Sequence, residues 1–84
     1  MRYTVEIEKP VLKYLEKLPE NIYRKLKAAI LNLEENPRPQ GSEKLTNRDA
    51  YRIRVGGYRI IYKIEDKILL VTIIDAGHRR EIYR

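Results

Sequence analysis

Residues 51–62 constrain the fold of this chain more than any other segment. They read YRIRVGGYRIIY, two alternating runs on either side of a Gly-Gly pair, which is the pattern of a β-hairpin with a two-residue turn. If the glycines form the turn, Val55 pairs with Tyr58 and Tyr51 pairs with Tyr62. Side chains alternate between the two faces of a strand, so the tyrosines, the valine and two isoleucines share one face. The opposite face carries Arg52, Arg54, Arg59, Ile61 and Lys63.

This register predicts that Arg54 lies directly opposite Arg59. Like charges in that position destabilise a sheet, and a hairpin selected only for stability would pair an arginine with a carboxylate. Two interpretations remain: the two side chains splay into water, or they converge on a bound anion. The second is favoured, because guanidinium groups gathered on one patch suit a phosphate.

The rest of the chain predicts an α+β fold. Residues 3–7 alternate like a half-buried strand, and residues 10–18 and 20–35 carry the apolar stripes of two helices separated by Pro19,. Residues 68–74 are almost entirely apolar, which is typical of a strand inside a sheet. The expected order is β-α-α-β-β-β: an N-terminal strand, an antiparallel helical hairpin and a mostly antiparallel sheet of about four strands, with the two helices on one face.

Composition limits the class of protein. The 84 residues predict one domain, residues 1–84,. The sequence has no cysteine and one histidine, so we expect no disulfide, no metal site and no cofactor. No segment approaches the roughly 18 apolar residues of a membrane span. We therefore expect a cytoplasmic protein without a membrane partner.

The formal net charge is +6, and the arginines are unevenly distributed. Six of the ten arginines lie in residues 50–84, namely Arg52, Arg54, Arg59, Arg79, Arg80 and Arg84. Arginine concentrated on strands indicates a face that binds nucleic acid or an acidic protein.

The C-terminal residues offer further candidates for a site. Arg79 and Tyr83 are four positions apart, so they share a face in either a strand or a helix. Tyr83 beside arginines could stack on a base or exchange a proton, or it could simply pack at an edge, and spacing alone does not decide. His78 is either a loop residue or a group that titrates near neutrality, and Asp75 is expected to order the loop before it.

The chain resembles the RelE/ParE superfamily of toxins from type II toxin–antitoxin modules. The resemblance is carried by the segment from Tyr51 to Tyr62, by the upstream LEENP and Lys44-Leu45, and by the closing GHRREIY. It covers essentially the whole chain and implies the same order of elements. The central motif is specific for the superfamily and less so for a branch within it.

The RelE branch of this family implies an endoribonuclease that cuts messenger RNA in the ribosomal A site, by attack of the 2′-hydroxyl on the adjacent phosphate. The resemblance also implies a cognate acidic, RelB-like antitoxin. The family's catalytic positions fall on Arg52, Arg54, Arg59, Arg79 and Tyr83 of this sequence.

One departure concerns the general base. Ribonuclease members often carry lysine where this chain has Arg52 and Arg54, and an arginine does not lose its proton in a protein. Either Tyr83 or His78 then accepts the proton, or the protein binds RNA and cuts it poorly. The alternatives are a ParE-like inhibitor of DNA gyrase, which the arginine-tyrosine pair disfavours, and a non-catalytic module that binds RNA or ribosomes.

Overall fold

The computed structural model describes residues 2–78 and Arg80. The chain begins with strand β1 (Thr4–Ile7), continues into helices α1 (Lys9–Glu16) and α2 (Glu20–Asn32), and then forms the short strand β2 (Glu43–Lys44). Strands β3 (Tyr51–Val55) and β4 (Tyr58–Glu65) follow, then a 3₁₀ turn η1 (Asp66–Ile68) and strand β5 (Leu70–His78). The predicted order of elements is confirmed, with β2 as an additional strand.

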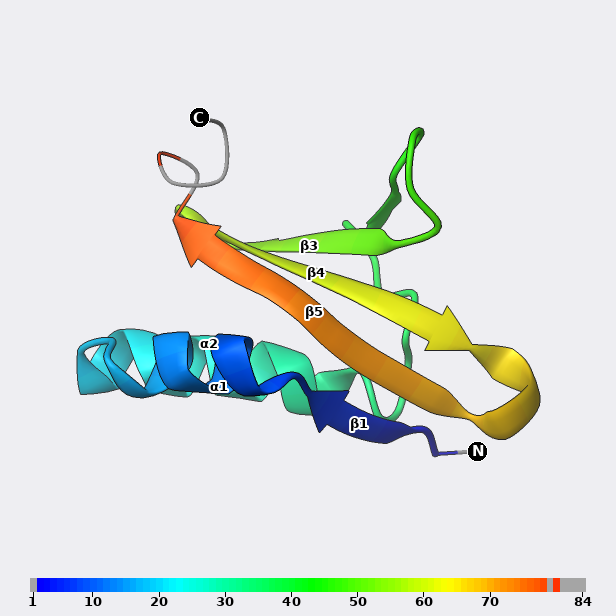
Figure 1. Ribbon diagram of the computed structural model, residues 1–84, viewed down its shortest axis with the longest axis horizontal. Helices are drawn as coiled ribbons and strands as arrows, with labels where there is room; N and C mark the ends of the chain where they lie inside the picture. The colour runs from blue at the N-terminus through cyan, green and yellow to red at the C-terminus, as the bar shows by residue number, and fades with distance from the viewer. Residues whose placement is uncertain (1, 79, 81–84) are drawn as a thin grey trace.

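The strands form one five-stranded sheet in the order β1-β5-β4-β3-β2 (Figure 1). The β1–β5 pair is parallel, and the other three pairs are antiparallel. The apolar segment near the C-terminus lies in the interior of the sheet, between β1 and β4, as its composition predicted.

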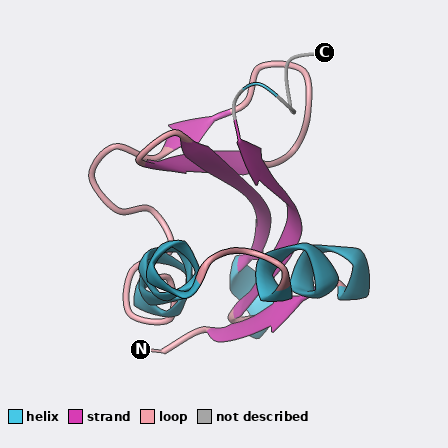
Figure 2. Ribbon diagram, turned by 90° about the vertical axis from the view of Figure 1, so that its left-hand side faces the viewer, coloured by secondary structure: helices cyan, strands magenta, loops and turns pink. Residues whose placement is uncertain are grey.

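The two helices form a hairpin on one side of the sheet; in Figure 2 most of the sheet curves above them, and the strand that follows the N-terminus lies below. Pro10 lies in the first turn of α1, where a missing N–H has no cost,. Helix α1 ends at Glu16, and Pro19 is the N-cap residue of α2. The apolar stripes of both helices pack on the sheet, and the buried core consists of Val11, Leu15, Leu26, Ile30, Leu33, Ile53, Ile60, Tyr62, Val71 and Ile73.

The predicted register of the β3–β4 hairpin is correct at every pair from Val55–Tyr58 to Tyr51–Tyr62. Gly56 has a φ of 62°, the left-handed value that favours glycine at the first position of such a turn. Ile53, Ile60 and Tyr62 are buried toward the helices. The side of the hairpin that carries the arginines therefore faces away from the helices.

Two features next to and within β5 differ from the sequence prediction. Leu69, expected in the core as part of a strand, instead ends η1 with a left-handed φ of 52° and is only half-buried. Residues 75–78, expected as a turn, continue β5. This extension requires an irregularity: Ile61 pairs with Asp75 but Tyr62 pairs with Ile73, so Ile74 has no partner in the β4 register. Such a bulge bends the strand and shifts which residues face the helices.

Candidate functional site

Three arginines lie together on the side of the sheet that faces away from the helices, and we call this group the arginine face: Arg52 and Arg54 on β3 and Arg59 on β4. Arg54 and Arg59 are direct cross-strand partners, a geometry that places Cβ atoms about 4.5–5.5 Å apart. On its other side Arg59 pairs with Gly77 of β5. Since glycine has no side chain, position 77 adds no side chain beside Arg59 on that strand.

The three side chains differ strongly in exposure. The Arg54 side chain is 56% exposed and that of Arg52 is 18% exposed, whereas Arg59 as a whole is 7% exposed. All three arginines lie on the side that faces away from the helices, as the register predicts, but Arg59 is buried there and not exposed to solvent. Arg59 lies on β4, near the middle of the sheet, while Arg52 and Arg54 lie on β3, next to the two-residue edge strand β2.

A carboxylate that sequence reasoning missed lies among these arginines. Arg52 Nη2 donates a hydrogen bond to Glu43 Oε1 at 2.5 Å, and Arg54 Nη2 lies 4.0 Å from the same oxygen. The hydrogen bond from Arg52 and its charge, with the charges of Arg54 and Arg59, hold the pKa of Glu43 below its usual range. The expectation that the Arg54–Arg59 pair lacks a compensating carboxylate is therefore wrong.

The segment that carries Glu43 is fixed by a polar network on the sheet edge. Arg38 donates to both carboxylate oxygens of Asp66, at 3.2 and 2.9 Å, and also to the Tyr51 hydroxyl. Tyr3 donates to Asp66 at 2.7 Å. The hydrogen bonds from Arg38, and secondarily from Tyr3, keep the pKa of Asp66 low. This network joins residues 37–44 to the first strand and to η1.

A buried phenol completes this attachment. Tyr62 donates a hydrogen bond to the Pro37 carbonyl at 2.8 Å and stacks on Tyr51 with ring centroids 5.9 Å apart. Burial raises the pKa of Tyr62 to about 12, so the hydroxyl remains a donor at neutral pH. Residues 37–44 are therefore tied to the hairpin, and the position of Glu43 follows from that attachment.

His78 lies on the opposite side of the sheet from the arginine face. It pairs with Tyr58 across β4–β5, and the two rings meet edge to face at 5.2 Å. A Cβ added at Gly57 would approach His78 Nε2 to 2.7 Å, so the imidazole packs directly on the turn. Of the two proton acceptors suggested by the sequence, His78 is thus separated from the arginines by the sheet itself.

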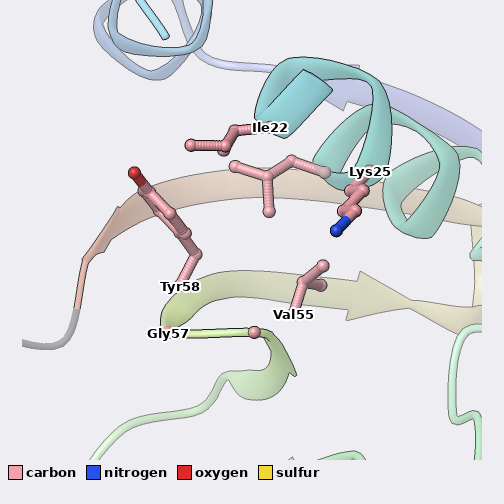
Figure 3. Close-up of a pocket in the computed structure, with 7 residues that line it drawn as sticks. Ile22, Lys25, Val55, Gly57 and Tyr58 are labelled. Atoms are coloured by element: carbon pink, nitrogen blue, oxygen red, sulfur yellow. The ribbon is translucent and has the colours of Figure 1, made fainter. Parts of the chain in front are cut away.

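A small hollow lies on the same side as His78, between the start of α2 and the tip of the hairpin (Figure 3). Its walls are mainly apolar, with one ammonium group at the edge. The lining residues are Ile22, Lys25, Leu26, Val55, Gly56, Gly57 and Tyr58. This hollow and the arginine face occupy the two sides of one hairpin.

Arg79 and Tyr83, the other two predicted site residues, lie outside the described residues. The structure brings together the remaining three and adds Glu43. Permanently charged guanidinium groups can bind a phosphate and stabilise charge that develops on it.

Across the described part of the chain, no group of three or more His, Cys, Asp or Glu side chains could hold a metal ion. Neither α1 nor α2 has the length and apolar character needed to cross a membrane.

The fold and the arginine face define a small basic α+β protein with three arginines on one side of a hairpin, and comparison with known proteins gives its family. The family model for the ParE toxin of type II toxin–antitoxin systems matches residues 5–83. Toxin RelG of Mycobacterium tuberculosis is 33% identical over 88 residues, covering 100% of this chain and 99% of the relative. The mRNA interferase toxin RelE of Escherichia coli is 29% identical over 99% of this chain and 92% of its own length.

A solved structure agrees with these sequence matches. The toxin in the archaeal RelE-RelB complex from Pyrococcus horikoshii superposes with a TM-score of 0.84 at 35% identity, covering 94% of this chain and 97% of that one. The chain belongs to the RelE/ParE superfamily, and it is a RelE-like toxin of the toxin–antitoxin type.

Proposed function

We propose that this protein is an endoribonuclease that cuts messenger RNA on the ribosome and so inhibits translation. The observation that carries the proposal is the arginine face: three guanidinium groups gathered on one side of a hairpin, in a chain similar to an mRNA interferase. A purely structural surface has no need for two arginines directly opposite each other, because their repulsion destabilises the sheet.

The proposed chemistry is an internal transfer at the scissile phosphate. The ribose 2′-oxygen forms a bond to phosphorus, the bond from phosphorus to the 5′-oxygen of the next nucleotide breaks, and a cyclic phosphate remains. The 2′-hydroxyl loses a proton and the leaving 5′-oxygen gains one, so no water or cofactor is consumed. Arg54 and Arg59 would bind the phosphate and stabilise the charge that accumulates on it.

We propose the proton acceptor by elimination among the candidate groups. Arginine at positions 52 and 54 cannot accept a proton, and His78 lies on the helix side of the sheet. We therefore assign this role to Tyr83, with Arg79 completing the set of phosphate donors. A neighbouring cation lowers the pKa of a phenol, which is the condition under which a tyrosine can act as a base.

The lack of a strong general base in the described part of the site also leads us to expect that cleavage depends on the ribosome. A site rich in cations but without a strong base gains most from a partner that holds the RNA in the reactive geometry, since correct orientation can supply a large part of a barrier. We expect the free enzyme to cut naked RNA slowly. The ribosome with messenger in its A site is the proposed substrate.

An acidic, RelB-like antitoxin is the proposed inhibitory partner. Two properties of the surface support it: the net charge of +6, and the apolar hollow with Lys25 at its edge on the helix side of the hairpin (Figure 3). An amphipathic segment can place an apolar side chain in such a hollow and its acidic residues against the surrounding cations. Growth rescue by a small protein encoded beside this gene tests the partner.

Inhibition of DNA gyrase is the second candidate, because the matching family model carries the ParE description. Induction of the protein in cells separates the two. Primer extension on recovered messenger should reveal new 5′ ends within coding regions soon after induction, with intact chromosomal DNA. Double-strand breaks and arrested replication without new messenger ends would favour the gyrase inhibitor and contradict the ribonuclease.

A further inference from the structure

The carboxylate of Glu43 is bound where an RNA phosphate oxygen would be expected to bind. Its Oε1 atom accepts the Arg52 hydrogen bond at 2.5 Å and lies 4.0 Å from Arg54 Nη2. Phosphate and carboxylate oxygens are recognised by arginine through the same charge-assisted hydrogen bonds. The contacts of Glu43 and the contacts proposed for RNA therefore overlap at Arg54, and the hydrogen-bond donor to Glu43, Arg52, lies on the same face of the hairpin.

Glu43 is also held as an anion. The pKa of its carboxyl is lowered, first by the hydrogen bond from Arg52 and then by the charges around it, including Arg54 and Arg59. It offsets the mutual repulsion of the arginines in the absence of RNA. The arginine face can thus be maintained in a folded sheet without a bound phosphate.

The attachment of Glu43 is weak enough to be reversed. Strand β2 has two residues and pairs only with β3 at the edge of the sheet. The Glu43 side chain is 56% exposed, and ion pairs at such positions stabilise proteins little. The flanking chain has separate attachments: Tyr62 binds the Pro37 carbonyl upstream and Leu45 N donates to the Ala50 carbonyl downstream. The side chain can therefore leave the arginines while the segment remains in place.

We propose that Glu43 is an affinity-setting residue, an internal carboxylate that occupies the phosphate position in the free toxin and is displaced by the RNA backbone. This inference rests on the proposed function, because it takes the arginine face to be the RNA site. Its consequence is selectivity. A small anion must compete with a tethered carboxylate, whereas an RNA strand with several phosphates gains enough contacts elsewhere to displace it.

The test is the affinity of the full chain for a short single-stranded 2′-O-methyl RNA, which cannot be cleaved because the attacking hydroxyl is blocked. Glu43→Gln should bind about threefold to tenfold more tightly than the wild type, since competition is removed while shape is kept. The matched control is Glu6→Gln. Glu6 is exposed on β1 at the opposite edge of the sheet, so this variant makes the same change in net charge far from the arginines and should bind as the wild type does.

A second measurement uses inorganic phosphate and thermal unfolding. Without phosphate, Glu43→Gln should melt at a slightly lower temperature than the wild type because the arginines lose their counter-ion. Added phosphate should raise its melting temperature by more than it raises that of the wild type. Equal or weaker RNA binding by Glu43→Gln, with or without a loss of cleavage, would overturn the proposal.

An additional variant, Arg54→Gln, separates failure of this inference from failure of the proposed function. If Arg54→Gln weakens RNA binding and Glu43→Gln leaves it unchanged, the arginine face is the RNA site and Glu43 does not compete there. If neither variant changes binding, the arginine face is not the RNA site, and both proposals are wrong.

Discussion

The two sides of the β3–β4 hairpin come from the same twelve-residue segment, but one side is an apolar core and the other carries charged side chains. On the helix side, Ile53, Ile60 and Tyr62 are buried in a continuous apolar core. On the other side, Arg54 and Arg59 face each other and share their surroundings with Glu43. The first side maximises stability. The second holds charges that a stable sheet would avoid, which is the usual property of a binding site. Substitutions on the helix side should therefore alter the stability of the fold, and substitutions on the arginine face should alter the rate of RNA cleavage.

The largest expected effect on stability is from Leu26→Ala on the helix side. Leu26 is 1% exposed, and truncating a buried leucine costs about 2–5 kcal/mol in free energy of unfolding. In a chain of this size, that loss lowers the melting temperature by roughly 10 °C or more. Cleavage per folded molecule should remain near the wild-type rate. Thermal denaturation by circular dichroism gives the first quantity, and a cleavage assay at low temperature gives the second. An unchanged melting temperature would contradict the core.

A smaller loss should follow from Tyr62→Phe. This variant removes the hydrogen bond to the buried Pro37 carbonyl, and an unsatisfied buried group costs about 1–3 kcal/mol.

The same residue predicts a pH dependence. Burial raises the pKa of Tyr62 from 10.0 to about 12. The folded state therefore retains this proton while the unfolded state releases it, so the contribution to stability is complete below pH 10 and is lost as the pH rises toward 12. In urea titrations between pH 9 and 12, the wild type should lose more stability than Tyr62→Phe. Parallel curves for the two proteins would contradict the assignment.

The smallest predicted effect is on antitoxin binding at the hollow on the helix side of the hairpin. Lys25 is exposed at its edge, and Lys25→Glu should weaken binding of the acidic antitoxin about threefold to tenfold through charge repulsion. Lys27→Glu is the matched control, because position 27 lies about 200° around the helix from position 25. Binding measured by calorimetry should be weaker only for Lys25→Glu. Equal effects of the two variants would indicate that general charge, and not the hollow, governs the antitoxin contact.

The predictable part of the molecule is the part dictated by local pattern. The alternation around Gly56-Gly57 determines the hairpin register, and the apolar stripes that include Leu15 and Leu26 determine which helix faces are buried. Each signal lies within a few residues of the structure it specifies. The three arginines of the arginine face could be predicted for the same reason, because their shared side of the sheet follows from the hairpin register.

The parts that could not be predicted depend on distant contacts. Glu43 lies in a strand of two residues, too short for any periodicity, and reaches Arg52 only because Tyr62 and Asp66 fix the preceding loop. The burial of Arg59 could not be predicted from the alternation of its own strand, which gives only the side of the sheet that it faces. Leu69 looks like a strand residue by composition, yet the turn after β4 imposes a left-handed backbone there.

If the arginine face carries out the RNA cleavage, the variant Arg59→Met should impair it strongly. Methionine keeps much of the buried volume and removes the charge. The matched control is Lys63→Met on the same strand, where an exposed cation faces the same side of the sheet closer to η1. The measurement is the rate at which each purified variant cuts messenger held in the A site of programmed ribosomes.

We expect Arg59→Met to cut messenger about 10²–10³-fold more slowly than the wild type, because one donor to the transition state is lost. Its melting temperature should be nearly unchanged, because methionine fills much of the same buried volume. Lys63→Met should cut at close to the wild-type rate. Full activity of Arg59→Met, or equal losses in both variants, would contradict the assignment of RNA chemistry to the arginine face.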